Sequence, residues 1–240
     1  MKLPAESSSS WVHISFAGFA CASLQAWSEF TALPQGDRAF LADLSTTLRV
    51  PTDALLKEAR ETEEQQFFIR PAAQARQNAW LTLLKRTTKE ALALVTIRIG
   101  NSSPDHPQVR QFLPRLLATI TGKKIAERSP AAEQAAGRLE GLEGHFPEKA
   151  ELAQRLRAIA DGAKHAIAGN EAARGSWGKE RSEEVVAKGR LRLELEKTHR
   201  LLGARFPGQK DFVESFFLRG SKPSEGSDDD EDGGEGEDEG

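Results

Sequence analysis

Residues 72–99 contain neither glycine nor proline, and apolar side chains recur in them at helical spacing. A helix of this length would be about 40 Å long at about 1.5 Å per residue. Two apolar stripes follow it, one made of Trp80, Leu84, Thr87, Ala91 and Leu94, the other of Leu81, Thr88, Leu92, Val95 and Ile99. Because two apolar stripes must be buried on more than one side of the helix, we expect it to lie at the centre of a helical bundle. A short buried strand near residues 95–97 is the alternative at its end, since that cluster is β-branched.

Glycine and proline divide the rest of the chain into further segments with helical periodicity. We expect helices over 37–50, 51–68, 129–145, 147–168, 179–204 and 207–218. Pro51 and Pro71 should end two of the segments, and Gly169-Asn170 should stop a third. Around Pro107, Pro147 and Pro207 the same turn recurs, with His or Phe before the proline and an apolar residue five positions after it. This pattern is typical of a hydrophobic staple that is reused between helices.

The sequence therefore predicts an all-α protein, an antiparallel bundle of about six to eight helices. Four parts are expected along the chain: an apolar N-terminal segment (1–35), a first helical half (36–125), a second helical half (126–219) and a disordered acidic tail (220–240). The repeated turns allow the two halves to be similar to each other. They are too unevenly spaced for a regular solenoid.

The acidic tail carries most of the charge asymmetry. Residues 221–240 hold ten acidic residues and a single lysine, so the rest of the chain is basic although the net charge is −3. Candidate residues for contact with a basic partner are Asp228, Asp229, Asp230, Glu231 and Asp232. Such a segment stays disordered because it has no apolar residues to bury. It either serves solubility alone or competes with nucleic acid for the basic body.

The N-terminal segment from 11 to 27 is the most apolar part of the chain. One helical face of it carries Val12, Phe16, Phe19, Ser23, Trp27 and Phe30. This spacing favours a packed helix or an amphipathic helix that binds a partner. The alternative is a weak secretory signal over residues 1–22, with a small-x-small pattern at 20–22. We expect a cytoplasmic protein without a transmembrane span, or a secreted one if the signal is real.

Motifs for chemistry are scarce. The single Cys21 excludes an intramolecular disulfide framework and a multi-thiolate zinc site, and the chain has no tyrosine. No nucleophile elbow, phosphate-binding loop or dinucleotide fingerprint occurs in it. Glu196 and His199 have the spacing of a di-iron ligand pair, but no second copy accompanies them, so a solvated pair is expected. We therefore expect no cofactor, no metal and no catalytic residue, and an enzyme is the least favoured class.

A basic row on the segment 179–204 is the candidate phosphate-binding face. It consists of Arg181, Lys188, Arg192 and His199, separated by seven, four and seven residues. Such a row neutralises phosphates without reading base sequence. Glutamates interleave with it, so much of its charge could instead serve ion pairs along a solvated face.

Two functional hypotheses follow. The first is a non-enzymatic scaffold, assembly or adaptor protein that acts through protein–protein contacts, with a protein partner or a second copy of itself. Its candidate contact residues are Trp11, Phe16, Phe19, Trp27, Phe30, Phe212, Phe216 and Phe217. Core packing is the competing explanation for these aromatic residues. The second hypothesis is a nucleic-acid-associated protein whose acidic tail moderates a basic helical body.

Overall fold

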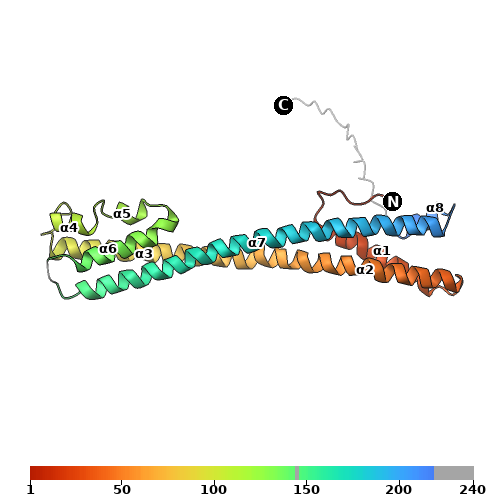
Figure 1. Cartoon of the computed structure of the whole chain (residues 1–240), viewed down its shortest axis with the longest axis horizontal. Coiled ribbons are helices and arrows are strands. Elements are labelled where there is room, and N and C mark those ends of the chain that lie inside the picture. Colours follow the sequence, from red (N-terminus) through yellow and green to blue (C-terminus); the bar gives the residue numbers. More distant parts are fainter. Residues whose placement is uncertain (144–145, 219–240) are drawn as a thin grey trace, which may run out of the picture. The chain divides into compact units, whose positions relative to one another are not determined.

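The structure is a computed structural model that describes residues 1–143 and 146–218. The chain is 80 % helical, and its described residues contain no strand. The elements in chain order are α1 (Ser10–Glu29), α2 (Gln35–Glu64), the π-helical turn η1 (Gln65–Ile69), α3 (Arg70–Arg98), α4 (Pro107–Phe112), α5 (Ala118–Thr121), α6 (Ile125–Glu140), α7 (Lys149–Arg205) and α8 (Lys210–Ser215) (Figure 1). The predicted all-α helical bundle is confirmed.

The chain forms two compact units. Among the described residues, we call 1–57 and 186–218 the terminal unit, and 58–143 together with 146–185 the central unit. Helices α2 and α7 each contribute residues to both units. The terminal unit combines the N-terminal segment with residues 186–218, and the divisions expected from the sequence at 35/36 and 125/126 stay predictions. The acidic tail and the expected helix end at His145 lie outside the described residues, so both stay predictions.

Two prolines do not end helices where the sequence suggested. Helix α2 runs through Pro51, and α3 begins at Arg70 with Pro71 in its first turn. The buried face of α2 continues across Pro51, because Leu48 and Leu55 on either side of it are fully buried. Burial of this face offsets the lost backbone hydrogen bond of the proline. The π-helical turn η1 lies directly before Pro71, so the chain continues from α2 into α3 without a loop.

Helix α7 contradicts the predicted stop at Gly169-Asn170 and the predicted loop up to Gly178. It is a single helix of 57 residues that passes through both positions. The Asn170 side chain donates a hydrogen bond to Gln77 Oε1, so it contacts α3 and does not cap a helix end. Each internal glycine costs roughly 1 kcal/mol relative to alanine. Packing of the flanking buried residues Ala166, Ile167 and Ala173 offsets this cost.

Helix α6 also begins earlier than expected, at Ile125 and not at Ser129. Ser129 is buried inside the helix, where its hydroxyl donates a hydrogen bond to Ala160 O on α7 over 2.6 Å. A serine before a proline is typical of a helix start. Here the hydroxyl instead fixes α6 against α7.

The central unit has its core where α3, α4, α6 and the first half of α7 meet. Leu84, Ala91 and Val95 of α3 are buried there with Phe112 and Leu156. Toward residues 58 and 185, the buried positions of α2, α3 and α7 are mostly alanine or polar residues, with one isoleucine among them: Ala59, Thr62, Gln77, Ala166, Ile167 and Ala173. This part of the unit therefore buries little apolar volume.

Candidate functional site: the α1–α2 groove and the α7 polar row

The two aromatic groups proposed from the sequence meet in the core of the terminal unit. Phe16 of α1 stacks on Phe217 at a centroid distance of 6.1 Å, and Trp27 meets Phe212 edge-on at 4.9 Å. Phe16, Phe216 and Phe217 are buried, and Trp27 and Phe212 are partly buried. These five side chains hold α1 against the C-terminal segment of the unit, as the core-packing alternative expects.

The other three aromatic candidates lie at the surface. Trp11, Phe19 and Phe30 are exposed, and Phe30 also packs on the Trp27 ring at 5.1 Å. They stay candidates for contact with a partner. The sequence placed Phe19 and Phe30 on one helical face with Phe16, but α1 extends only to Glu29 and Phe30 lies beyond it.

The cationic side chains of α7 contact the N-terminal segment. Lys188 Nζ donates to Ser8 O over 3.2 Å, and Arg192 donates to Pro4 O and lies 3.1 Å from His13 Nε2. Neither side chain is fully exposed. Both cations therefore hydrogen-bond backbone carbonyls of residues 4–8, and their role in phosphate binding stays a prediction.

The other two members of the basic row are also engaged. Arg181, in the central unit, packs on the Trp177 ring at 5.4 Å from the centroid. His199 Nε2 lies 3.1 Å from Glu214 Oε1, which also accepts from the Met1 ammonium. The pKa of the Glu214 carboxyl is lowered, first by the hydrogen bond from that ammonium and then by the one from His199. Glu196, the expected neighbour of His199, pairs with Arg200 at 3.6 Å, as expected for a solvated side chain.

His13 is the buried polar centre of this contact. Its Nδ1 lies 3.1 Å from Ser9 O and its Nε2 lies 3.1 Å from Arg192 Nη1, and the side chain is fully buried. A carbonyl only accepts and a guanidinium only donates, so Nδ1 carries the proton and Nε2 accepts. Burial lowers the pKa of His13, and the nearby Lys188 and Arg192 charges lower it further. The imidazole is therefore neutral where Arg192 binds it.

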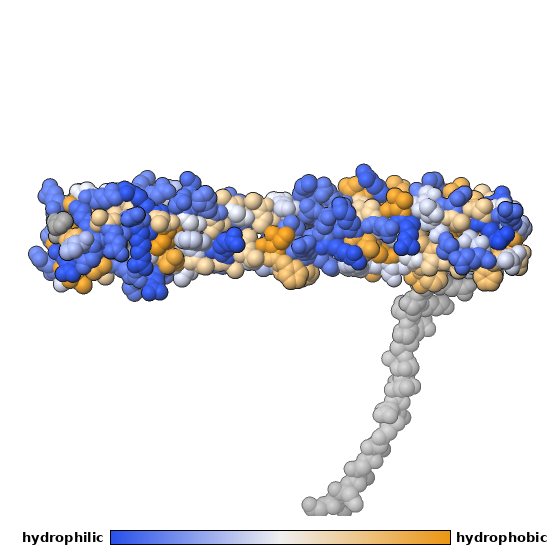
Figure 2. Space-filling view, turned by 90° about the horizontal axis from the view of Figure 1, so that it is seen from below, coloured by the Kyte–Doolittle hydropathy of each residue, from blue (hydrophilic) through white to orange (hydrophobic). Residues whose placement is uncertain are grey.

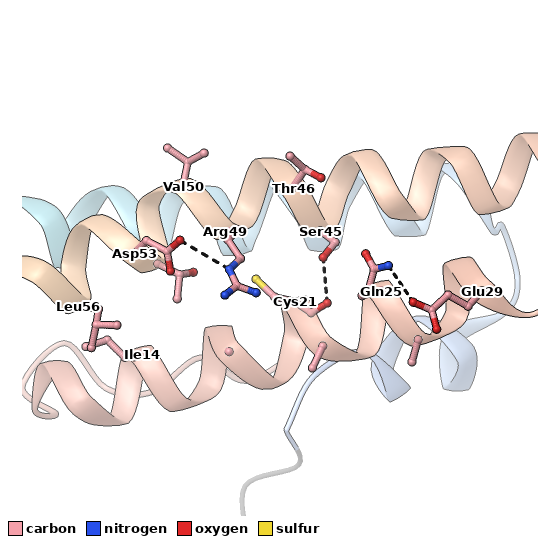
Figure 3. Close-up of a pocket in the computed structure, with 14 residues that line it drawn as sticks. Ile14, Cys21, Gln25, Glu29, Ser45, Thr46, Arg49, Val50, Asp53 and Leu56 are labelled. Atoms are coloured by element: carbon pink, nitrogen blue, oxygen red, sulfur yellow. Dashed lines mark hydrogen bonds and ion pairs between the residues drawn. The ribbon is translucent and has the colours of Figure 1, made fainter.

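A groove on the surface of the terminal unit runs between α1 and α2. Its volume is about 900 Å³, and its walls are Ile14, Gly18, Cys21, Ala22, Gln25, Ala26 and Glu29 of α1 and Ser45, Thr46, Arg49, Val50, Thr52, Asp53 and Leu56 of α2. Figure 3 shows the two helices side by side, with Ile14 and Leu56 near one end and Gln25 and Glu29 toward the other.

Small residues on α1 open this groove. Gly18, Ala22 and Ala26 follow each other at intervals of four residues and are exposed. No atom lies within 4 Å of the position that a Cβ on Gly18 would take. The two helices are joined beneath by Ser45 Oγ, which donates to Cys21 O over 3.0 Å (Figure 3). The spacing of these small residues can be read from the sequence. The opposite wall of the groove, on α2, cannot, because only the tertiary structure brings the two helices together.

Polar side chains line the rim of the groove. Arg49 Nε and Asp53 Oδ2 form an ion pair at 3.6 Å, and Gln25 Nε2 donates to Glu29 Oε1 over 2.9 Å (Figure 3). Cys21 is buried at the groove, and burial raises the pKa of its thiol. A thiol that stays protonated is a poor nucleophile. The groove therefore has an apolar floor with a charged rim, and its chemistry suits binding.

One group of carboxylates, which the sequence analysis did not anticipate, lies in the central unit. Oxygen atoms of Glu58, Glu180 and Glu183 come within 4.8 Å of one another. Glu183 is exposed and pairs with Lys179 at 3.6 Å. Glu58 and Glu180 are half-buried, and Glu58 Oε2 has no hydrogen-bond partner among the described residues.

No protein-family profile, curated protein or solved structure significantly matches this chain. Within residues 1–143 and 146–218, no helix combines the length and the apolar character that crossing a membrane requires.

Proposed function

We propose that this protein is a helical adaptor or scaffold whose α1–α2 groove binds an amphipathic helix of a partner protein. The observation that carries the proposal is the open row of small residues, Gly18, Ala22 and Ala26, facing α2 across a groove of about 900 Å³. Small side chains let the backbone of a third helix approach α1 closely, and helix-in-groove binding uses this geometry.

The dimensions of the groove fit a short helix. From Ile14 to Glu29 the wall on α1 spans 16 residues, and the 15 steps between them cover about 22 Å at about 1.5 Å per residue. A partner helix of about four turns would cover it. The exposed Val50 on α2 offers an apolar contact at one edge. The Arg49–Asp53 pair at the rim favours a partner helix with one apolar stripe and polar flanks.

A cytoplasmic location is part of this proposal. The support is the packing of α1, which places Phe16, Ala17, Ala20 and Cys21 in the core of the terminal unit. Cleavage of a signal over residues 1–22 would remove these side chains and one wall of the groove. Mass spectrometry of the N-terminus of the protein from its natural cells tests this, and a mature chain that begins near residue 23 would contradict it.

We do not carry nucleic-acid binding forward as a second function. Lys188 and Arg192 bind backbone carbonyls of the N-terminal segment, and His199 contacts Glu214. Phosphate contacts by Lys188 and Arg192 would have to use the donors that these bonds leave over. Fluorescence anisotropy with labelled DNA and RNA across a salt series is the check, and tight, salt-sensitive binding by the full chain would restore the hypothesis.

Selection from a displayed library of random amphipathic helical peptides tests the groove. The full chain serves as target, and Ala22→Trp is the variant that fills the floor of the groove. Ala39→Trp is the matched control, because Ala39 is an exposed alanine of α2 that does not line the groove. We expect enriched peptides whose Kd is weakened at least about tenfold by Ala22→Trp and unchanged by Ala39→Trp. Failure to enrich any peptide, or equal binding to all three proteins, would contradict the proposal.

A further inference from the structure

The π-helical turn η1 exposes three large apolar side chains in succession. Phe67 is 60 % exposed, Phe68 is 72 % exposed and Ile69 is 41 % exposed. A π-helical turn holds one more residue than an α-helical one, so it changes the direction of the side chains that follow. Figure 2 shows apolar areas, orange and tan, between the blue hydrophilic areas of the surface. Three large exposed apolar side chains within one turn exceed the single ones that are normal at a surface, and they mark a candidate interaction site.

A small groove lies beside these aromatic rings. Its volume is about 530 Å³, and it is lined by Gln65, Ile69, Ala72, Ala73 and Arg76 on one side and by Gly169, Ala172, Ala173 and Ser176 of α7 on the other. Most of these side chains are small. The same face of the central unit therefore carries both a bulky projection, Phe68, and a shallow recess that could receive one.

Four exposed residues form a row along this face at intervals of four. They are Glu64, Phe68, Ala72 and Arg76. The row reverses its chemistry about residue 70: an acidic and an aromatic residue precede that position, and a small and a basic residue follow it. Glu64 and Arg76 are twelve residues apart, or about 18 Å along the helix, so they cannot pair with each other in one chain.

We propose that two copies of this chain associate through the η1–α3 face, antiparallel about a two-fold axis near residue 70, with Phe68 of each copy in the small-residue groove of the other. In this arrangement Phe68 lies opposite Ala72 of the second copy, and Glu64 lies opposite Arg76. An isologous contact requires such self-complementarity, in which each residue of a pair meets its counterpart twice. Arg70, at the axis, packs on the Trp177 ring at 4.6 Å, so its charge is directed toward α7.

The two exposed rings supply about a third of the area that a standard interface buries on each partner. From the exposed fractions of Phe67 and Phe68 and an area of about 200 Å² per aromatic side chain, the two rings offer roughly 260 Å². A standard interface buries about 800 Å² on each partner. Ile69, the exposed alanines of α3 and the stems of Glu64 and Arg76 extend the surface. We therefore expect association in the micromolar range.

Sedimentation velocity of the full chain from about 1 to 300 µM tests the proposal, because micromolar association is populated over this range. The wild type should shift from monomer to dimer. Phe68→Ser should weaken the association constant at least about tenfold. Ile97→Ser is the matched control, because Ile97 is 63 % exposed on α3, the helix that follows η1, and lies far from residue 70. Far-UV circular dichroism checks that all variants remain folded.

Charge reversal tests the antiparallel register. Glu64→Arg and Arg76→Glu each create like-charge contacts at two symmetry-related places, so each should weaken dimerisation by about fivefold. The double variant restores opposite charges and should recover the wild-type constant. A wild-type monomer at the highest concentration, an equal loss for Ile97→Ser, or a double variant no better than the singles would each overturn the proposal. Because this surface is in the central unit, a negative result leaves the α1–α2 groove to be judged by its own selection experiment.

Discussion

Gly162 lies where Trp80 packs against α7, and its replacement by alanine provides a sharp test of the central unit. A Cβ at position 162 would stand well inside van der Waals contact with Cη2 and Cζ3 of the Trp80 ring, and 2.7 Å from its Cε3. Trp80 packs against the core of the unit, so the ring has little room to retreat. We expect Gly162→Ala to destabilise the protein although alanine is the better helix former.

Gly175→Ala is the matched control on the same helix. No atom lies within 4 Å of the position that its Cβ would take. This substitution should stabilise the protein by about 0.5–1 kcal/mol through helix propensity alone. Propensity contributes equally at both sites, so the difference between the two variants measures the cost of overpacking. That cost is typically about 1–3 kcal/mol.

Urea unfolding followed by far-UV circular dichroism and tryptophan fluorescence supplies the two free energies of unfolding. A double-mutant cycle with Trp80→Leu adds a second check, because the smaller side chain leaves room for the new methyl group. The cycle should show a favourable coupling of about 0.5–3 kcal/mol. If Gly162→Ala stabilises the protein as much as Gly175→Ala, the packing of Trp80 on Gly162 is refuted.

Three further predictions concern single side chains. Burial holds the folded-state pKa of His13 below 6.5, so the unfolded chain binds the proton more readily than the folded chain. The contribution of His13 to stability is therefore full above pH 6.5 and is lost as the pH falls below it. His13→Gln should flatten this pH dependence of the free energy of unfolding in urea titrations, and an unchanged slope would argue against a neutral buried imidazole. Ser129→Ala should cost about 0.5–1.5 kcal/mol of unfolding free energy, because it removes a buried hydrogen bond while the Ala160 carbonyl keeps its backbone donor inside α7, whereas a neutral result would mean that this bond is absent. The Cys21 thiol should react with a disulfide reagent far more slowly in the native protein than in urea, because it is buried and stays protonated; equal rates in the two conditions would show that it is accessible.

Helical periodicity was sufficient to predict the all-α class, because the buried positions of α3 and α7 repeat every three or four residues whatever they pack against. It was insufficient to locate the helix ends. Pro51 and Gly169-Asn170 disfavour a helix locally by roughly 1–3 kcal/mol each. Long-range burial of neighbours such as Leu48 and Leu55 exceeds that cost in the folded chain, and a local pattern does not contain this contribution.

For the candidate sites too, the sequence predicted local features, and the tertiary structure decided which residues are buried or paired. From the sequence alone, Phe16 and Phe217 could be either contact residues or core, and their stacking decided for core only once α1 met the end of the chain. Lys188 and Arg192 were correctly placed on one helix, but the carbonyls of Ser8 and Pro4 that they bind come from more than 170 residues away. The α1–α2 groove has one wall in each helix. Side-chain chemistry and spacing are local properties of the sequence, whereas burial and partnership depend on which distant segments pack together, and only the tertiary structure determines that.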